Sequence, residues 1–297
     1  MESLFAKYGY TPDKESISKR LDAIAANIDN VTSQEVLKNC MALMDLTTLH
    51  TEDSPESVKK LVGKVNSFMN DYPEYPLPAS ICVFPNLASV VRENLATSDV
   101  HVTAVAGCFP TSQSFIEVKV KECEMAVDAG ADEIDIVLAL NAFMSGDEET
   151  ARKEIRTIRA AVDEAAAKAG RKVTLKVILE TGLLVTPENI ANASFLAMEE
   201  GADFIKTSTG KVSVNATPMA AYIMCESIKA FHEKTGRKVG FKAAGGISTS
   251  KDAVCYHSIV KTILGNDWIN KELFRFGVSR LANSLMSSIE QKTVVYF

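Results

Sequence analysis

The chain has 297 residues, of which 46% are hydrophobic, and a formal net charge of −6 at pH 7. This composition indicates a globular protein with one large core or two medium ones, and it excludes a disordered or fibrous chain. The net negative charge provides no positive field that would attract nucleic acid or an anionic membrane. No segment of the sequence approaches the ~18 consecutive apolar residues that a membrane-spanning helix needs.

Two further features indicate the compartment. The six cysteines are scattered, with no C-x-x-C pair and no histidine at zinc-ligand spacing, so they predict reduced thiols and no metal site. The N-terminal stretch MESLFAKYGYTPDKESISKRLD has early acidic residues and no apolar segment, which is not typical of a signal peptide. We therefore expect a cytoplasmic protein.

Short β-rich segments alternate with longer amphipathic ones from about residue 43 to residue 289, without a Pro/Gly/Ser-rich linker. The eight expected strands are residues 42–49, 80–85, 101–106, 133–140, 173–180, 203–208, 239–244 and 273–277. Helix starts are indicated by a capping hydroxyl followed by proline, at Ser54-Pro55, Thr186-Pro187 and Thr217-Pro218. Helix ends are indicated by glycines just before strands, at Gly130, Gly170, Gly201 and Gly236.

This alternation predicts the fold class and the domain organisation. Eight β/α units in one stretch of about 250 residues favour an α/β fold of the (β/α)8 TIM-barrel type over a doubly wound sheet. We expect an N-terminal helical extension over residues 1–40, a catalytic barrel over 41–290 and a C-terminal tail over 291–297.

Two internal repeats align charged residues within the expected strands. AGADEIDIV (129–137) resembles EGADFIKTS (200–208), and AGRKVTLKVILE (169–180) resembles TGRKVGFKAAGG (235–246). The first pair superposes Asp135 on Lys206, and the second superposes Lys176 on Lys242. Alternate residues of a barrel strand point inward, and those near the strand C-termini line the active site. We therefore expect three lysines and one aspartate to converge there.

A single lysine in a strand usually marks a solvated face or an edge. The strands of a parallel barrel are covered by helices outside and packed inside, so they leave no wet face. This favours a functional position for Lys206 and Lys242. For Lys176, a buried, paired lysine without a chemical step is an equal alternative.

The converging charges predict Schiff-base chemistry. A free lysine has a pKa of about 10.4, so at pH 7 roughly one in 2,500 is a neutral amine that can attack a carbonyl. Burial and a neighbouring cation can lower that pKa, and a facing pair of lysines therefore makes one of them nucleophilic. Aldolases, dehydratases and some isomerases all remain open at this point.

Glycine and hydroxyl residues gather at the ends of the last three strands, in STGK (208–211), AAGGIS (243–248) and FGVS (276–279). Barrels often bind phosphate with the loops after strands seven and eight, where glycine lets backbone N–H groups approach the ligand. We predict a phosphate site there, against the alternative of ordinary turn glycines. Lys211, beyond Gly210, meets either phosphate or solvent.

Three other residues leave alternatives open. Asp45, followed by Thr47 in LMDLTTL, either orients a substrate hydroxyl or caps a local turn. Cys82, where a strand meets its loop, fits a small core residue. The tail QKTVVYF either docks on the barrel, where folding over the mouth would bring the Tyr296 hydroxyl to the site, or trails in solvent.

The motifs together resemble a known family. LMDLTTL, GADEIDIV, LKVILETG, DFIKTSTGK, GFKAAGGI and LFRFGVS, in this order over nearly the whole barrel, resemble the deoxyribose-phosphate aldolases, class I aldolases of the (β/α)8 type. The resemblance implies reversible cleavage of 2-deoxy-D-ribose 5-phosphate to D-glyceraldehyde 3-phosphate and acetaldehyde, without a metal or an organic cofactor. The implied partner is a small sugar phosphate, with no nucleic acid or membrane; a homo-oligomer stays open.

The resemblance also implies roles for individual residues. Lys206 would form the Schiff base with C1 of the open-chain sugar, and Lys242 would lower its pKa. Asp135, with a bound water, would take the C3 hydroxyl proton and relay protons at C2, with Lys176 in the same network. The positions that match the family's phosphate loops are Gly210, Gly245, Gly246, Gly277 and Ser279, and those that match its substrate pocket are Asp45 and Cys82. Thr47, Thr209 and Lys211, close to them in the sequence, are further candidates for substrate binding.

The chain departs from the family pattern at two positions. The family commonly ends on a tyrosine proposed to assist proton transfer at C2, whereas here Phe297 follows Tyr296. Arg280 follows Ser279 where many relatives carry a second small hydroxyl residue. Alternatives to this function are another Schiff-base barrel, such as a transaldolase-like or keto-acid aldolase, and a sugar-phosphate-binding barrel without turnover.

Overall fold

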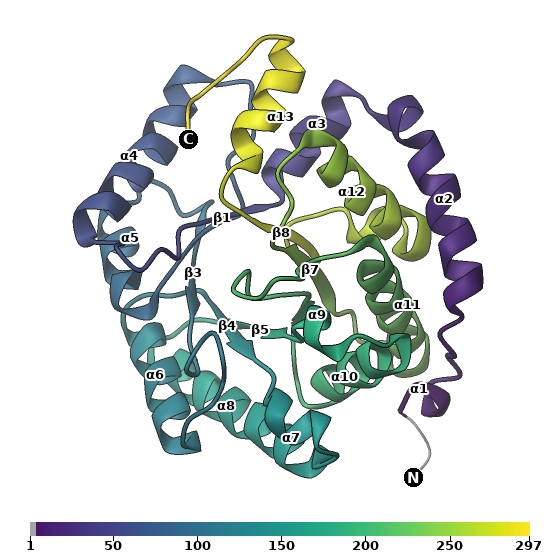
Figure 1. Ribbon diagram of the computed structural model, residues 1–297. Helices are drawn as coiled ribbons and strands as arrows, with labels where there is room; N and C mark the ends of the chain where they lie inside the picture. The colour runs from purple at the N-terminus through teal and green to yellow at the C-terminus, as the bar shows by residue number, and fades with distance from the viewer. Residues whose placement is uncertain (1–3) are drawn as a thin grey trace.

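Eight parallel strands close into a barrel in chain order, with helices around it (Figure 1). The structure, a computed structural model, describes residues 4–297. The strands are β1 (Met44–Thr47), β2 (Ser80–Val83), β3 (His101–Val105), β4 (Glu133–Val137), β5 (Thr174–Ile178), β6 (Phe204–Lys206), β7 (Gly240–Ala244) and β8 (Phe274–Val278). Since β8 pairs with β1, the barrel is closed, and the prediction of a (β/α)8 TIM barrel is confirmed.

Helices surround the barrel; the first three precede β1, and the others come after the strands. They are α1 (Leu4–Lys7), α2 (Lys14–Val31), α3 (Gln34–Ala42), α4 (Pro55–Asp71), α5 (Ala88–Asn94), α6 (Ile116–Asp128), α7 (Leu140–Met144), α8 (Glu148–Lys168), α9 (Thr181–Leu184), α10 (Pro187–Glu199), α11 (Pro218–Thr235), α12 (Ser250–Leu264) and α13 (Leu281–Glu290). A short 3-10 helix, η1 (Pro85–Leu87), precedes α5, and η2 (Asn266–Trp268) precedes β8.

The expected helix boundaries have the predicted local chemistry. The side chains of Ser54, Thr186 and Thr217 accept hydrogen bonds from backbone N–H groups of the first turns of α4, α10 and α11. Each cap is followed by proline at the first helical position, where no N–H partner is needed. Gly236 ends α11 with φ = 73°, a left-handed conformation that glycine adopts without strain.

The strands are shorter than the apolar segments that predicted them. Residues 133–140 were expected as one strand, but β4 ends at Val137 and Leu140 begins α7. The intervening Leu138 and Ala139 are buried, so the hydrophobic pattern continues past the end of the hydrogen-bonded ladder. Likewise β6 ends at Lys206, and the buried residues after it form a loop at the barrel mouth.

Alternation along each strand separates the outer core from the barrel interior. In β4 and β5, the apolar residues Ile134, Ile136, Leu175 and Val177 are fully buried in the hydrophobic core. The residues between them then point to the opposite side of the sheet, into the barrel. These interior positions are charged, as described below.

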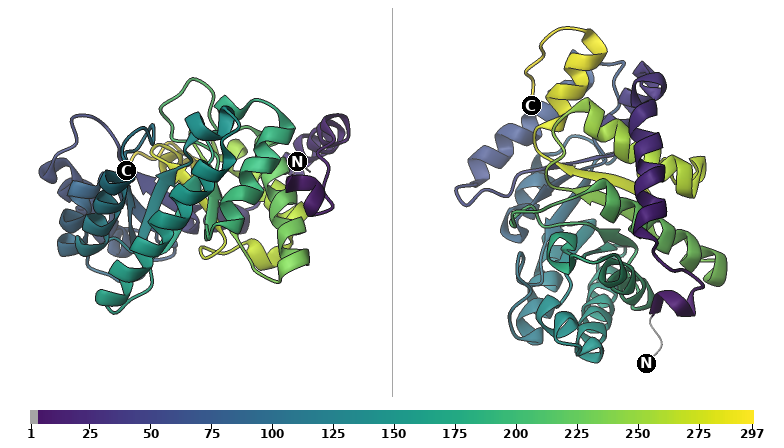
Figure 2. Two further views of the ribbon diagram at one scale, coloured as in Figure 1. Left: turned by 90° about the horizontal axis from the view of Figure 1, so that it is seen from below. Right: turned by 45° about the vertical axis from the view of Figure 1, so that its right-hand side comes forward.

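The N-terminal helices lie outside the barrel. Figure 1 and Figure 2 show α2 along the outer side of α11 and α12, and the Tyr8 ring after α1 stacks on Phe195 of α10 with 4.5 Å between ring centroids. The division into an extension, a barrel and a tail stays a prediction, and α3 extends two residues past its boundary at residue 40. Among residues 4–297, no helix combines the length and the apolar character that crossing a membrane requires.

Candidate active site

The barrel interior holds a cluster of buried charges, which we call the interior ion network. Its members come from six of the eight strands and include four cations and three carboxylates. They are Asp45 (β1), Glu133 and Asp135 (β4), Lys176 (β5), Lys206 (β6), Lys242 (β7) and Arg275 (β8).

Strand register brings the four predicted charges together. Asp135 pairs with Lys176 across β4 and β5, and Lys206 pairs with Lys242 across β6 and β7. Because these residues occupy inward positions of parallel strands, their side chains meet inside the barrel rather than at a wet face. The convergence expected from the internal repeats is present in the structure.

Asp135 is the centre of this arrangement. Its Oδ1 accepts a hydrogen bond from Lys176 Nζ at 2.9 Å, and its Oδ2 accepts one from Lys206 Nζ and one from Lys242 Nζ, each at 2.8 Å. Burial alone would raise the pKa of Asp135, but the three ammonium groups hold that pKa well below its usual range. Asp135 is therefore a carboxylate that can accept a proton only when one of its cations is removed or neutralised.

The two neighbouring lysines have opposite electrostatic surroundings. Burial lowers the pKa of Lys206, and the Lys242 ammonium lowers it further against the opposing effect of Asp135, so the net shift is downward. Burial would also lower the pKa of Lys242, but the carboxylates of Asp135 and Asp45 raise it well above its usual value. Lys206 therefore loses its proton more easily than Lys242, which stays protonated.

The lower part of the network contains residues that the sequence did not single out. Arg275 donates hydrogen bonds to Asp45 Oδ1 at 2.5 Å and to Glu133 Oε1 at 2.6 Å. Glu133 also forms an ion pair with Lys176. Its carboxylate is hydrogen-bonded to Nδ1 of His101 at 2.7 Å, and this partly exposed histidine is the last residue of the network. The alternation of inward and outward residues along a strand could have identified Glu133 and Arg275. Glu133 lies two residues before Asp135, and Arg275 lies two residues before Gly277, so each is on the same side of its strand as a predicted site residue.

A cavity of about 260 Å³ opens at the barrel mouth above Lys206. The residues that line it come from the C-terminal ends of β1, β6, β7 and β8 and from the loops after them. They are Thr47, Leu49, His50, Lys206, Thr209, Gly210, Lys211, Ala244, Gly245, Gly246, Gly277, Val278, Ser279 and Arg280. The nucleophile candidate and all five residues of the predicted phosphate loops therefore share one cavity, together with the cations Lys211 and Arg280.

Glycine is required at two positions of this cavity. Gly245 has φ = 81°, and a Cβ there would lie 2.6 Å from the side-chain oxygen of Asn215. A Cβ on Gly277 would lie 2.9 Å from Cβ of Ala244. Gly245 fits against Asn215, and Gly277 against Ala244, only because these side chains are missing, which keeps the backbone accessible from the cavity.

The loop after β6 is held in place by contacts across the mouth. Lys211 Nζ donates a hydrogen bond to the Leu49 carbonyl at 2.5 Å, so it is not simply a solvent-facing residue. The Thr209 hydroxyl donates to Glu180 Oε2 at 2.5 Å, and its backbone N–H donates to Glu180 Oε1 at 3.2 Å. Glu180 is buried and has φ = 53°; the sequence reasoning missed it, although it ends the LKVILE segment.

Two predicted pocket residues do not line the cavity. Asp45 lies below it, where it contacts Lys242 and Arg275, and its role toward a substrate hydroxyl stays a prediction. Cys82 is fully buried beside Leu49 and Val105, and burial raises the pKa of its thiol. These contacts agree with the interpretation of Cys82 as a small core residue. Thr47 does line the cavity, and its hydroxyl donates to the Asp45 carbonyl at 2.8 Å.

The structure does not bring Tyr296 to the barrel mouth. Its hydroxyl donates a hydrogen bond to Asp71 Oδ2 at 2.7 Å and lies 3.1 Å from the Lys64 carbonyl, both on the outer helix α4. The ring packs against Phe68 and Tyr72 of the same region, because an apolar tail gains more from this aromatic cluster than from a charged cavity. Figure 1 shows the C-terminus beside α4 and α13.

Comparisons with known proteins agree with the geometry. The model of the DeoC/LacD family aldolases matches residues 39–262. The chain is 38% identical over 266 residues to the deoxyribose-phosphate aldolase of Homo sapiens, covering 86% of this chain and 80% of that one. It is 35% identical over 292 residues to the enzyme of the same name from Bos taurus, covering 94% and 88%.

A solved structure extends the comparison to three dimensions. The tetrameric deoxyribose phosphate aldolase from Aeropyrum pernix superposes with a TM-score of 0.66 at 25% identity, covering 93% of this chain and 98% of that one. The similarity therefore spans the barrel and is not confined to the motifs around the lysines.

Proposed function

Since this chain belongs to the DeoC/LacD family of aldolases, we propose that it is a class I deoxyribose-phosphate aldolase. The reaction is the reversible cleavage of 2-deoxy-D-ribose 5-phosphate to D-glyceraldehyde 3-phosphate and acetaldehyde. One observation carries the proposal: a buried lysine with a lowered pKa, Lys206, lines the same cavity as the glycine loops after β7 and β8.

The first step is the attack of the neutral Lys206 amine on C1 of the open-chain sugar. A carbinolamine forms, and protonation of its hydroxyl by the proton that the Lys206 ammonium gave up, followed by loss of water, gives a protonated imine that can take up the electron pair of the C2–C3 bond. Lys242 remains an ammonium beside it, because Asp135 and Asp45 raise its pKa. A fixed positive charge at that position disfavours protonation of the Lys206 amine before attack.

The second step breaks the bond between C2 and C3. Asp135 takes the C3 hydroxyl proton while the C2–C3 electron pair moves towards the imine, so D-glyceraldehyde 3-phosphate leaves and an enamine remains on Lys206. Arrival of this electron pair neutralises the positive charge on the Lys206 nitrogen, which is a partner of Asp135, so the carboxylate becomes a better proton acceptor as the bond breaks. A proton returned to C2 and hydrolysis of the imine then release acetaldehyde and the free amine.

Phosphate recognition is proposed for the far side of the cavity. Gly246 and Ser279 would present backbone N–H groups and a hydroxyl to the phosphate oxygens, while Gly245 and Gly277, which also line the cavity, let the backbone come close to the ligand. Arg280 and Lys211 line the same cavity and would add positive charge. The Lys211 ammonium already bonds to the Leu49 carbonyl, so it would contact phosphate without leaving its place in the loop.

The decisive experiment measures acetaldehyde release from deoxyribose 5-phosphate by the wild type and by Lys206→Ala. We expect release by the wild type and loss of release by the variant, with borohydride reduction in the presence of substrate trapping an adduct on Lys206. An active enzyme whose Lys206 stays unmodified would refute the Schiff-base assignment. Activity only with pyruvate or a ketose phosphate would instead favour another Schiff-base barrel, and binding without acetaldehyde a sugar-phosphate-binding barrel.

The proposal also includes self-association. The related aldolase from Aeropyrum pernix is a tetramer, and this chain matches it over most of its length.

A further inference from the structure

A second cavity, of about 510 Å³, lies between helix α2 and the helices that cover the barrel. Its walls come from α2, α3, α11 and α12, and Figure 1 and Figure 2 show α2 along the outer side of α11 and α12. Arg20, Ala23, Ile24, Asn27 and Val31 line it at spacings that place them on one face of α2. It has no lining residue in common with the cavity at the barrel mouth, so the two are separate.

His257 of α12 lines this cavity as a buried polar side chain without a partner. Its exposed fraction is 4%, and its Nε2 has no hydrogen-bond partner among residues 4–297. Burial and the nearby Lys261 ammonium lower the pKa of His257 to about 4, so its ring is neutral at pH 7. Nearly all buried polar atoms in native proteins have a partner, because an unpaired one keeps its desolvation cost. A ligand in the cavity would supply the partner that the chain does not.

The charges around His257 favour an anionic ligand. Arg20 and Lys261 line the cavity, whereas no carboxylate does among the residues described. Arg20 lies 3.8 Å from Glu226, so its charge is partly balanced, and the charge of Lys261 remains for a ligand. Arg20 Nη1 also donates a hydrogen bond to the Tyr222 hydroxyl at 3.1 Å. A hydroxyl that accepts a bond keeps its own proton to donate, so Tyr222 and Lys261 together suit one negatively charged acceptor group.

The remaining wall predicts the other part of the ligand. It includes the apolar side chains Ala23, Ile24, Val31 and Val36. Small-molecule sites in proteins have volumes of roughly 300–1,000 Å³ and are mostly apolar, with a few polar groups that orient the ligand. This cavity has the same character, because its polar groups gather on α11 and α12 opposite an apolar face of α2. An apolar chain or ring with a single carboxylate matches both parts.

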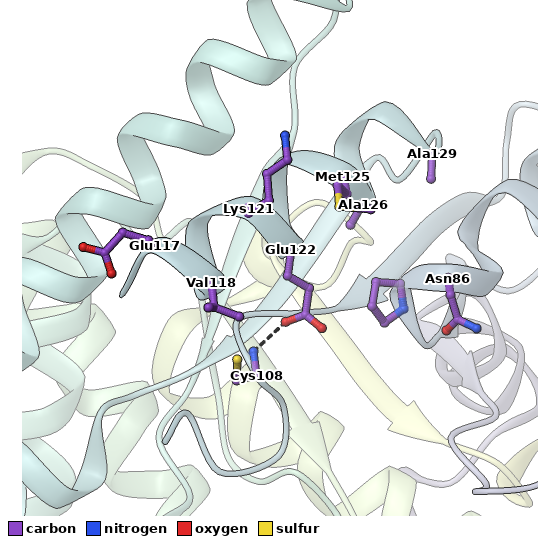
Figure 3. Close-up of a pocket in the computed structure, with 10 residues that line it drawn as sticks. Asn86, Cys108, Glu117, Val118, Lys121, Glu122, Met125, Ala126 and Ala129 are labelled. Atoms are coloured by element: carbon purple, nitrogen blue, oxygen red, sulfur yellow. Dashed lines mark hydrogen bonds between the residues drawn. The ribbon is translucent and has the colours of Figure 1, made fainter. Parts of the chain in front are cut away.

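The larger hollow beside α6 does not have this combination. It has a volume of about 600 Å³, and Glu117 and Glu122 line it. Figure 3 shows the Glu122 carboxylate turned towards Cys108, whose backbone N–H donates a hydrogen bond to it at 2.6 Å, while Lys121 points away. Carboxylates in the wall disfavour an anion, so the charge pattern selects the cavity beside α2.

We propose that the cavity between α2, α11 and α12 binds a small organic carboxylate with an apolar body. The carboxylate lies between Lys261, Tyr222 and His257, and the apolar body packs against the face of α2. This gives α2 a part in ligand binding. The inference does not depend on the proposed reaction, because the cavity is separate from the one above Lys206 and the acetaldehyde assay tests that reaction by itself.

The first test is isothermal titration calorimetry with octanoate as the probe. We expect saturable binding of one octanoate per chain with a Kd below about 1 mM, and binding of uncharged 1-octanol that is about tenfold weaker or less. Lys261→Ala should raise the Kd for octanoate about tenfold. Lys60→Ala is the matched control, because Lys60 is an exposed lysine of α4 that does not line the cavity, and it should leave the Kd unchanged. Equal affinities for octanoate and 1-octanol, or no saturable binding up to about 10 mM octanoate, would overturn the proposal.

The second test locates the bound probe by NMR of the histidine rings. The chain has four histidines, and the variant His257→Phe identifies the signal of His257 by its loss. Octanoate at pH 7 should shift the His257 signal and leave that of His50, which lines the cavity at the barrel mouth, in place. A shift of His50 without a shift of His257 would place octanoate at the barrel mouth and refute the proposal.

Discussion

Lys206 and Lys242 have the same side chain, lie on adjacent strands and are both buried, yet their pKa values shift in opposite directions. The difference lies in the carboxylates. Asp135 contacts both lysines, whereas Asp45 contacts Lys242 and not Lys206. One extra carboxylate therefore decides which lysine stays protonated and which can supply a free amine.

We predict that Lys242→Leu lowers kcat/KM at pH 7 by about 10- to 1,000-fold, because a neighbouring charge shifts a pKa by roughly 1–3 units. Without the Lys242 ammonium the pKa of Lys206 rises, so the acidic limb of the pH–rate profile should move to higher pH and activity should partly return in alkaline buffer. The pH dependence of kcat/KM measures this shift, with circular dichroism to confirm folding.

Lys238→Leu is the control for this variant. Lys238 is an exposed lysine just before β7 whose ion pair with Asp267 lies outside the barrel. Its removal should leave the pH–rate profile in place. An identical profile for the wild type and Lys242→Leu would contradict the electrostatic role of Lys242.

At the scale of elements, the site depends on loops that short contacts fix at the barrel mouth. β6 contributes three residues, and the loop after it brings Thr209, Gly210 and Lys211 to the cavity. Glu180, at the end of the β5 segment, holds that loop through both the backbone N–H and the hydroxyl of Thr209. Glu180 is thus a positioning residue for the cavity, not one that touches the reacting atoms.

Glu180→Gln is therefore expected to raise KM for deoxyribose 5-phosphate by about 5- to 20-fold, the equivalent of about 1–2 kcal/mol of lost loop support. kcat should change much less, because the interior ion network stays intact. Steady-state kinetics separates the two parameters, and Glu188→Gln, at the exposed start of α10, serves as the control. A loss confined to kcat would show that Glu180 acts in the chemical step instead.

These elements also show which boundaries a local sequence pattern can predict and which it cannot. Proline and hydroxyl caps predicted the starts of α4, α10 and α11, because a cap satisfies backbone groups within one turn of the helix. The ends of β4 and β6 were predicted too late, since Leu138 and Ala139 stay buried after the ladder has ended. A strand ends where its hydrogen bonds to the neighbouring strand end. The hydrophobic residues of one segment do not show where that is.

At the scale of the whole molecule, the ion network links strands that are far apart in sequence. Arg275 joins β8 to β1 through Asp45 and to β4 through Glu133, while Lys176 holds β5 to β4. Such a network is stable only while each buried charge keeps its partners, because an unpaired buried charge carries a large desolvation cost. The residues that prepare Lys206 for chemistry therefore also contribute to barrel closure.

Lys176→Met should lower the free energy of unfolding by about 3–5 kcal/mol, because it leaves the buried carboxylates of Glu133 and Asp135 short of one cation. Urea denaturation followed by circular dichroism measures the change. Lys168→Met removes an exposed lysine whose partner, Glu164, is one helical turn away, and it should leave the unfolding curve where it is. Equal curves for Lys176→Met and the wild type would contradict the stabilising role of the network.

The sequence by itself determined the (β/α)8 order of elements, the helix caps, and the alignment of Asp135, Lys176, Lys206 and Lys242. These features repeat along the chain, so periodicity and internal similarity are enough to find them. Only the tertiary structure decided the partners of these charges. Lys242 meets Asp45 across 197 residues and Arg275 meets Asp45 across 230, and no local pattern encodes contacts of that separation.

The same reason explains the other differences. Tyr296 lies on α4 because an aromatic cluster from distant segments forms there. Whether a side chain is buried, and which charge it pairs with, depends on the closed barrel. The residue types that allow this burial and pairing can be seen in the sequence.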